Sequence, residues 1–468
     1  MAERPDPLLR EDRRTSVRVY GQMIRLTLPI VVQNLLSALV SSADVMMLSS
    51  LGQSAISAVS LAAQYTSLVS MVYFGLGTGV SILASQYWGR KDIHAIELVQ
   101  GIALRFSMLV SVICFVLMMT VPEALMRVYT PDPELIELGV LYLRITGFGF
   151  LFWGVSEMYL ASLRSVGRVT ISTMISTLSL GLNVLLNAVF IFGLLGAPKM
   201  GVLGVGMATS IARAAALVAC FGVSACSGDV KLRLRLMFVR NRALFRDFLH
   251  MSVPALLNDV SWGAAFSLYS AIMGHMGSDV VSANAIVVVI RNFATVLCYA
   301  VGGAATIWVG RLLGAGELEA ARRDAGRLIR LTVVTGLLGG LLMLGAIPIA
   351  LRYAEGYVHL TEQAVGFLRV MLLINSYYVM GTAVNTTLIV GIFRAGGDSR
   401  FGFICDSVDM WCYGVPLGFL AAFVLKLPPM WVYFLICTDE FVKWPWVFRH
   451  YRSMKWLKNI TRDYGQGA

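Results

Sequence analysis

Long apolar runs recur along the chain, and short connections between them hold most of the charged residues. Each run matches the length that a helix needs to cross the hydrocarbon core of a bilayer, which is roughly 30 Å thick. The pattern predicts an all-α integral membrane protein with twelve transmembrane helices. We expect these spans near residues 24–48, 54–85, 96–121, 138–161, 169–193, 201–225, 248–273, 279–309, 327–350, 366–393, 401–425 and 429–448.

Basic residues are distributed unequally over the two ends of these spans. If both termini are cytoplasmic, the inner connections hold 27 of the 38 Lys and Arg residues and the outer connections hold four. Cytoplasmic loops of membrane proteins carry such an excess of positive charge. We therefore expect a multi-pass protein of the cytoplasmic membrane with both termini inside. The net charge of +11 then reflects topology, and we expect no nucleic-acid partner.

The composition and the absence of some motifs exclude other classes of protein. Charged residues make up 14% of the chain and hydrophobic residues 57%, whereas soluble domains carry about 25% charged residues. The sequence contains no Walker A motif, so we expect no energy from ATP bound to this chain, and its five histidines form no HExxH pattern. We expect no enzyme activity and no cofactor. The expected partners are the lipid bilayer and small organic molecules, and the expected state is a monomer.

The two halves of the chain repeat the same landmarks. A shift of 225 residues places Pro29 on Pro254, Gly52 on Gly277, Gly77 on Gly302, Gly89 on Gly314 and Ala95 on Ala320. This spacing predicts two six-helix lobes, residues 1–225 and 248–468, joined by a basic cytoplasmic linker at 226–247. Since each lobe has an even number of spans, a pseudo-two-fold axis along the membrane normal relates them. A cleft between two such lobes is typical of a transporter that works by alternating access.

Polar side chains inside the first lobe are candidates for a cation site. Asp44 lies in span 1, Asn183 and Asn187 lie four residues apart in span 5, and Thr209 lies in span 6. Ionisable residues are rare in membrane spans because they are costly there. Carboxylate, amide and hydroxyl oxygens suit Na⁺, and a carboxylate can bind H⁺. The alternative is that the amides and the hydroxyl only hold helices together.

The second lobe has its own acids. Asp259 in span 7 and Asp406 and Asp409 in span 11 are candidates for binding a cation or the substrate. We favour Asp259 and Asp409 because no neighbouring cation balances either of them. Glu440 and Lys443 lie three residues apart in span 12, so we expect them to form a structural ion pair.

Aromatic and sulfur-containing side chains form a pool of candidates for lining the cleft. Such side chains bind flat or cationic ligands, although on membrane helices they more often pack or face lipid. The pool comprises Met46, Met47, Phe150, Trp153, Trp262, Tyr269, Tyr377, Tyr378 and Trp411.

Several motifs resemble the multidrug and toxic compound extrusion (MATE) family. They include "TLPIVVQNLL", "ADVMMLSSLG", "GLGTGVSILASQYWGRKD", "GVLGVGMATSIAR" and "FRAGGDSRFGFICDSVDMWCYGVPLGF". The resemblance covers about residues 20 to 461 and implies a twelve-helix fold of two lobes. It also implies an antiporter that exports organic, often cationic amphipathic compounds in exchange for H⁺ or Na⁺.

The resemblance also implies roles for individual residues. Asp44 matches the span 1 aspartate of the family's cation site, Asn183 a polar residue of span 5, and Thr209 the span 6 threonine. Some members have an aspartate where this chain has Asn187, so this lobe has one carboxylate fewer. Asp259 resembles an acid on span 7 of other members, at a shorter spacing from the preceding proline. The alternative function is a flippase for lipid-linked sugars or other lipids, which would favour a strongly cationic central cavity.

Overall fold

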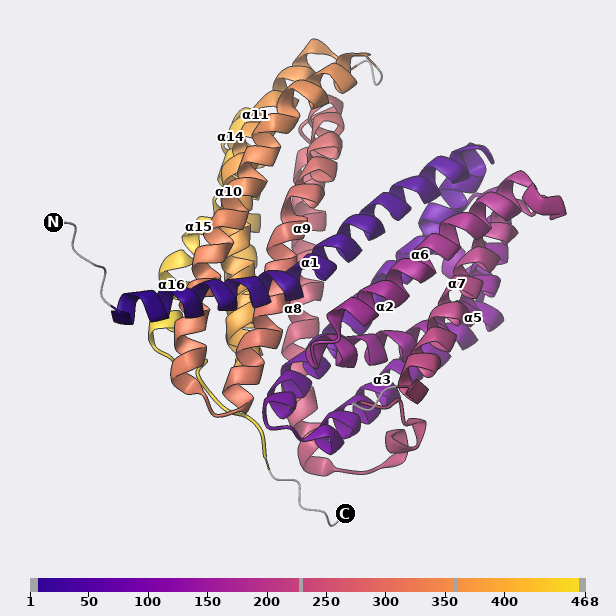
Figure 1. Cartoon of the computed structure of the whole chain (residues 1–468). Coiled ribbons are helices and arrows are strands. Elements are labelled where there is room, and N and C mark those ends of the chain that lie inside the picture. Colours follow the sequence, from indigo (N-terminus) through magenta and orange to yellow (C-terminus); the bar gives the residue numbers. More distant parts are fainter. Residues whose placement is uncertain (1–6, 227–229, 357–359, 463–468) are drawn as a thin grey trace.

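The computed structural model describes residues 7–226, 230–356 and 360–462, in which every regular element is a helix (Figure 1). Residues 1–6, 227–229 and 463–468, which we predict to be cytoplasmic, lie outside the described residues, as do residues 357–359. Figure 1 shows two groups of helices that converge near the C-terminus and diverge away from it.

The N-terminal lobe contains the six spans predicted for the first half. Its helices are α1 (Pro7–Ser49), α2 (Gln53–Gly89), α3 (Ile93–Thr120), α4 (Pro122–Arg127), α5 (Pro133–Ser165), α6 (Val169–Phe192) and α7 (Gly201–Cys226), with a 3₁₀ turn, η1, at Leu194–Gly196. The short α4 is a connection, so α1, α2, α3, α5, α6 and α7 are the six long helices of this lobe.

The C-terminal lobe begins after the 3₁₀ turn η2 (Leu234–Phe238). Spans 7 to 9 are α8 (Arg242–Gly274), α9 (Ser278–Gly314) and α10 (Leu318–Gly356). Span 10 is α11 (Glu362–Asn385) followed by the π-helix η3 (Thr386–Phe393). Span 11 consists of α12 (Ser399–Val408), the π-helix η4 (Asp409–Gly414), α13 (Val415–Phe419) and the π-helix η5 (Leu420–Val424).

Span 12 is not the single helix that the sequence predicted. It is divided into α14 (Pro429–Ile436), α15 (Asp439–Val442) and α16 (Trp444–Arg452). Irregular backbone at membrane depth is tolerated only where protein buries it or where it lines a cavity. The breaks flank Asp439, Glu440 and Lys443, all of which are buried, so the break coincides with a buried charged cluster.

Ten helices in the described part of the chain are long and apolar enough to cross a membrane. They do not include α8 or the divided span 12. The first turns of α8 are basic and its middle carries Asp259, which lowers its hydropathy. This helix nevertheless takes the place of the first span of the second lobe.

The first helix of each lobe begins against the opposite lobe. Met23 in α1 packs into a core cluster formed mainly by the C-terminal lobe, whereas Leu244 and Phe248 in α8 pack into the core of the N-terminal lobe. Pro29 and Pro254 lie inside these two helices, and Figure 1 shows α1 changing direction along its course. A proline inside a helix removes one backbone hydrogen bond and favours a bend.

The glycine before the second helix of each lobe has the same role. Gly52, before α2, has φ 100°, and Gly277, before α9, has φ 124°. Both angles lie in the region that favours glycine. Gly52 and Gly277, which the repeat predicts to be equivalent, therefore form the same turn in both lobes.

The basic linker is bound to α3. Arg105 donates from Nε to the carbonyl of Met237 at 2.6 Å and from Nη2 to that of Val239 at 2.8 Å. Glu97 accepts a hydrogen bond from the backbone N–H of Lys231 at 3.0 Å. The part of the linker that the structure describes is therefore a packed element.

We expect Arg105→Ala to destabilise the protein by about 2 to 4 kcal/mol, because it removes two hydrogen bonds from a charged group. The measurement is the midpoint of thermal unfolding of the detergent-purified protein. Arg127→Ala, on the short helix α4, is the control and should leave the midpoint unchanged. Equal midpoints for the two variants would show that the linker is held by other contacts.

Candidate functional site

The four side chains predicted to bind a cation lie together inside the N-terminal lobe. Asp44 extends from α1, Asn183 and Asn187 from α6, and Thr209 from α7. Asn187 Nδ2 donates to Asp44 Oδ1 at 2.8 Å and to Asn183 Oδ1 at 3.4 Å. Asn183 Nδ2 donates to Thr209 Oγ1 at 3.2 Å. One chain of hydrogen bonds thus connects three membrane-spanning helices, which we call the Asp44 cluster.

The Asp44 cluster offers oxygen atoms to a small cation. Asn187 is 1% exposed, and its Oδ1 has no hydrogen-bond partner among the described residues. A buried acceptor without a partner is unfavourable, so approach of a cation would stabilise it. Carboxylate and amide oxygens suit Na⁺, while Asp44 could instead take H⁺. The donor set fits either ion, and cation binding here stays a prediction.

Asp259 in the C-terminal lobe is not free of a neighbouring cation. Its Oδ1 lies 3.6 Å from Arg394 Nη2. Arg394 follows the predicted span 366–393, so we expected it in a cytoplasmic connection, but its side chain is buried at the end of η3. The expectation that no cation balances Asp259 is therefore wrong.

Asp409 is also close to a cation. Lys443 Nζ lies 3.8 Å from Asp409 Oδ2, 3.1 Å from Asp406 Oδ1 and 3.2 Å from Glu440 Oε2. The predicted contact of Glu440 with Lys443 is present, but the lysine also serves the two aspartates. The reason for favouring Asp409 over Asp406 therefore fails, since both face the same ammonium group.

A central cavity of about 650 Å³ lies between the lobes. Helices α1, α2 and α5 line one side, and α9 and η3 line the other. Its polar groups include Gln33, Asn34, Thr78 and Tyr299, and its apolar wall includes Phe74, which is 59% exposed. A mixed wall of this kind suits an amphipathic molecule.

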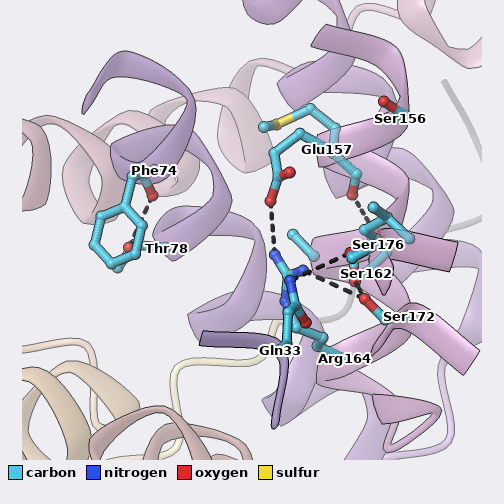
Figure 2. Close-up of polar contacts among 12 residues, drawn as sticks. Gln33, Phe74, Thr78, Ser156, Glu157, Ser162, Arg164, Ser172 and Ser176 are labelled. Atoms are coloured by element: carbon cyan, nitrogen blue, oxygen red, sulfur yellow. Dashed lines mark hydrogen bonds and ion pairs between the residues drawn. The ribbon is translucent and has the colours of Figure 1, made fainter. Parts of the chain in front are cut away.

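The charged part of the cavity wall is an ion pair on α5, which was not among the candidates predicted from the sequence. Arg164 Nη2 lies 2.9 Å from Glu157 Oε1, and Arg164 Nη1 donates to Ser172 Oγ at 3.3 Å. Figure 2 shows this pair beside Gln33, whose Nε2 donates to Ser176 Oγ at 3.2 Å. Glu157 is the one acid within the predicted span 138–161, so the reasoning applied to Asp44 could have found it.

None of the aromatic and sulfur-containing candidates is among the residues that line the central cavity. Trp262 lines a neighbouring chamber of about 70 Å³, and Tyr269 and Tyr378 line another of about 190 Å³. The others have different surroundings. The Arg213 guanidinium lies over the rings of Trp153 and Phe150. Tyr377 packs on Phe434 and Phe441, and the Trp411 indole donates to Ser261. Met46 is exposed, and Met47 packs at the edge of the N-terminal core.

The two lobes are in close contact at the end near the C-terminus. Gln86 in α2 donates to the carbonyl of Ala395 at 2.7 Å and accepts from the backbone N–H of Ile460 at 2.9 Å. A Cβ on Gly314 would lie 1.8 Å from the carbonyl oxygen of Gln86, and one on Gly89 would lie 2.1 Å from that of Arg311. The repeat-related glycines thus allow α2 and α9 to touch, which closes this end of the molecule.

Two helical lobes around a central cavity, with polar clusters buried among membrane-spanning helices, define a multi-pass membrane transporter. The model of the MatE family matches residues 29–189 and 254–420. The two matches begin 225 residues apart, which is the offset of the internal repeat. The chain belongs to the MatE family, whose members are multidrug transporters, as the sequence motifs predicted.

Proteins similar to this chain match it in length, and a solved structure matches its fold. An uncharacterized transporter, YisQ, of Bacillus subtilis is 25% identical over 93% of this chain and 95% of its own. A probable multidrug resistance protein, NorM, of Chromobacterium violaceum is 25% identical over 88% of each chain. The structure of a Vibrio cholerae MATE transporter superposes with a TM-score of 0.83 at 16% identity, over 95% of this chain and 99% of that one. These relatives confirm the two-lobe, twelve-helix fold and do not favour the lipid flippase.

Proposed function

We propose that this protein is an antiporter that exports organic, often cationic amphipathic compounds in exchange for H⁺ or Na⁺, with the coupling ion bound at the Asp44 cluster. The observation that carries the proposal is the Asn187–Asp44 hydrogen bond at 2.8 Å, beside a buried amide oxygen without a partner. A membrane protein retains an acid among such groups at a considerable energetic cost. The excess of basic residues on one side supports insertion in the cytoplasmic membrane with both termini inside.

Helix α1 connects the Asp44 cluster to the central cavity. Ser37, which lines the cavity, precedes Asp44 by two helical turns, so both lie on the same face of α1. Binding of a cation at Asp44 neutralises the negative charge of its carboxylate and changes its hydrogen bond with Asn187. A shift of α1 relative to α6 would then alter the cavity wall, which links ion binding to release of the exported compound.

The cavity supports the assigned class of substrate. The aromatic rings of Phe74, in the N-terminal lobe, and Tyr299, in the C-terminal lobe, line the cavity. Aromatic faces attract organic cations. Glu157 adds a carboxylate, and the apolar wall accepts the hydrophobic part of the compound. These features suit a flat amphipathic molecule that fits within about 650 Å³.

The test is transport by the purified protein in liposomes loaded with a fluorescent organic cation such as ethidium. Release is measured under an imposed Na⁺ gradient at equal pH, under a pH gradient without Na⁺, and without a gradient. We expect one of the two gradients to accelerate release. Equal rates in all three conditions, and in liposomes whose gradients are collapsed by ionophores, would contradict coupled antiport.

Phe74→Ala is expected to raise the half-saturating concentration of an aromatic cation about 2- to 30-fold, because a cation–π contact contributes about 0.5 to 2 kcal/mol. The measurement is the concentration dependence of transport in liposomes. Phe221→Ala is the matched control, since Phe221 is exposed on α7 and does not line the cavity. An equal change in the two variants would show that Phe74 acts on folding or insertion only.

A further inference from the structure

The C-terminal lobe contains a buried cluster of charges that the proposed function does not use. Lys443 is surrounded by Asp406, Asp409 and Glu440, and Asp439 adjoins Glu440 in α15. All five side chains are at most 6% exposed. We call these five residues the Lys443 cluster.

Negative charge exceeds positive charge in the Lys443 cluster. Four carboxyl groups share one ammonium group, and the neighbouring Arg394 is itself engaged by Asp259. A buried ionised carboxylate is tolerated only when it is paired and hydrogen-bonded. When buried carboxyl groups lie close together, some of them keep a proton. The cluster therefore cannot hold all four acids in the ionised form around a single lysine.

Two buried amide groups point to a ligand at this place. Asn258 donates from Nδ2 to Asp406 Oδ2 at 3.1 Å, and Asn385 donates from Nδ2 to the Glu440 carboxylate. Both asparagines are 3% exposed, and within the described residues the Oδ1 atom of each has no hydrogen-bond partner. Both side chains line the chamber of about 70 Å³ that also contacts Asp406 and Lys443. Unpaired acceptors in a chamber beside carboxylates suit a proton donor such as water or a protonated carboxyl.

The internal repeat gives the Lys443 cluster a counterpart. The Asp44 cluster uses the first, fifth and sixth spans of its lobe, and the Lys443 cluster with Asn258 uses the first, fifth and sixth spans of the other lobe. At the offset of 225 residues, Asn183 falls one position before Asp409. The two lobes therefore place polar clusters on equivalent helices, but only the second contains a lysine.

We propose that the Lys443 cluster is a second ion-handling site, which binds and releases protons and excludes Na⁺ because the Lys443 ammonium already occupies the place of a cation. One proton moves from solution onto a carboxylate oxygen of Asp409 or a neighbouring acid and later returns to solution. Within the cluster, Asp406 and Lys443 line the chamber of about 70 Å³, which shares Phe74, Tyr299 and Val390 with the central cavity. The cluster therefore meets the transport path at Asp406. The proposal does not depend on the Asp44 cluster.

The surroundings of Asp409 define which groups could titrate with it. Its own span contributes Cys405 and Asp406, and α8 contributes Tyr269, while Asp259 of α8 faces Asp406. The divided span 12 contributes Asp439, Glu440 and Lys443, and Arg394 follows η3. Asp409 is the most informative position, because neither of its carboxylate oxygens has a hydrogen-bond partner in the described part of the chain.

The test is infrared difference spectroscopy of the purified protein in lipid during a pH step, which detects the carbonyl band of protonated carboxyl groups. We expect a pH-dependent band that is retained in Asp44→Asn and lost when Asp409→Asn is added to that variant. In Asp44→Asn, which lacks the acid of the first cluster, the band should be identical in sodium and choline buffers. Asp409→Asn preserves the size of the side chain, and retention of ethidium binding would show that the variant folds. In the Asp44→Asn protein, persistence of the whole band after Asp409→Asn and after Glu440→Gln would overturn the proposal, as would suppression of the band by Na⁺.

A second variant tests the role of the lysine. Lys443→Met, made in the Asp44→Asn protein, removes the Lys443 ammonium, so we expect the band of the cluster to become sensitive to Na⁺ in the same measurement. If the band of Lys443→Met stays independent of Na⁺ in a protein that still binds substrate, the ammonium does not account for exclusion of the metal ion. If Lys443→Met does not fold, Lys443→Arg retains the charge and should retain the behaviour of the natural protein.

Discussion

Asp44→Asn is expected to abolish ion-coupled transport in a protein that still folds and binds its substrate. Asparagine has nearly the same shape as aspartate but carries no charge at any pH. The Asn187 Nδ2 donor, 2.8 Å from Asp44 Oδ1, could still pair with the new amide oxygen, so the packing of α1 on α6 should survive. The cluster would lose its one carboxylate, and with it the group that can take H⁺ or attract Na⁺.

Asp44→Asn should lower the rate of gradient-driven transport at least about 10-fold. A loss of about 1.4 kcal/mol in the free energy of cation binding already weakens binding by that factor. Substrate binding, measured by fluorescence titration in detergent, should change less than about 3-fold. Glu123→Gln makes the same chemical change in α4, outside the membrane spans, and should leave transport unchanged. Full coupling in Asp44→Asn would remove the Asp44 cluster from the mechanism.

The sequence predicted the Asp44 cluster well because its spacing obeys regular helix geometry. Asn183 and Asn187 are four residues apart in α6, a continuous helix, so both face the same way. Asp44 and Thr209 lie in helices that pack on α6. Three local patterns were therefore enough to bring four side chains together.

The C-terminal lobe could not be read in the same way, because its helices are irregular where the charges lie. The π-helix η3 ends immediately before Arg394, and η4 begins at Asp409. A π-helical turn shifts the register of hydrogen bonds from i+4 to i+5, so sequence spacing no longer indicates which side chains share a face. The position of Arg394 next to a loop made it resemble a cytoplasmic residue, although its side chain is buried beside Asp259.

The lining of the central cavity was also outside the reach of sequence patterns. An aromatic residue looks the same in a sequence whether it packs in a lobe, faces lipid or faces the cavity. Phe74 and Tyr299 are exposed to the cavity because α2 and α9 come together at one end and separate toward the other. That arrangement depends on contacts between residues more than 200 positions apart, such as Gln86 with Ala395 and Ile460.

Gly314→Ala is expected to open the end of the transporter at which α2 and α9 touch. The added Cβ would lie 1.8 Å from the carbonyl oxygen of Gln86, which is far inside van der Waals contact, so the helices must separate. Overpacking of this kind costs about 1 to 3 kcal/mol. It would shift the balance between the state seen here and one open at this end by about 5- to 150-fold. Alternating access requires both states, so transport should fall.

The separation of the lobes at this end can be measured between spin labels at His94→Cys and Glu319→Cys, two exposed positions related by the repeat. They lie at the starts of α3 and α10, the helices that follow α2 and α9. The exposed Cys226 and Cys412 would first be replaced by serine. We expect longer distances in Gly314→Ala than in the parent, and no change in Gly345→Ala, where a Cβ meets nothing within 4 Å.

A further variant, Gln86→Leu, opens the same end by a different route. It removes the hydrogen bonds to Ala395, Lys458 and Ile460 without adding side-chain atoms, and it should lengthen the same distance. If both variants keep the parent distances and the parent transport rate, close packing of α2 on α9 does not form the gate. If the distances lengthen while transport is unchanged, opening of this end is not the step that limits transport.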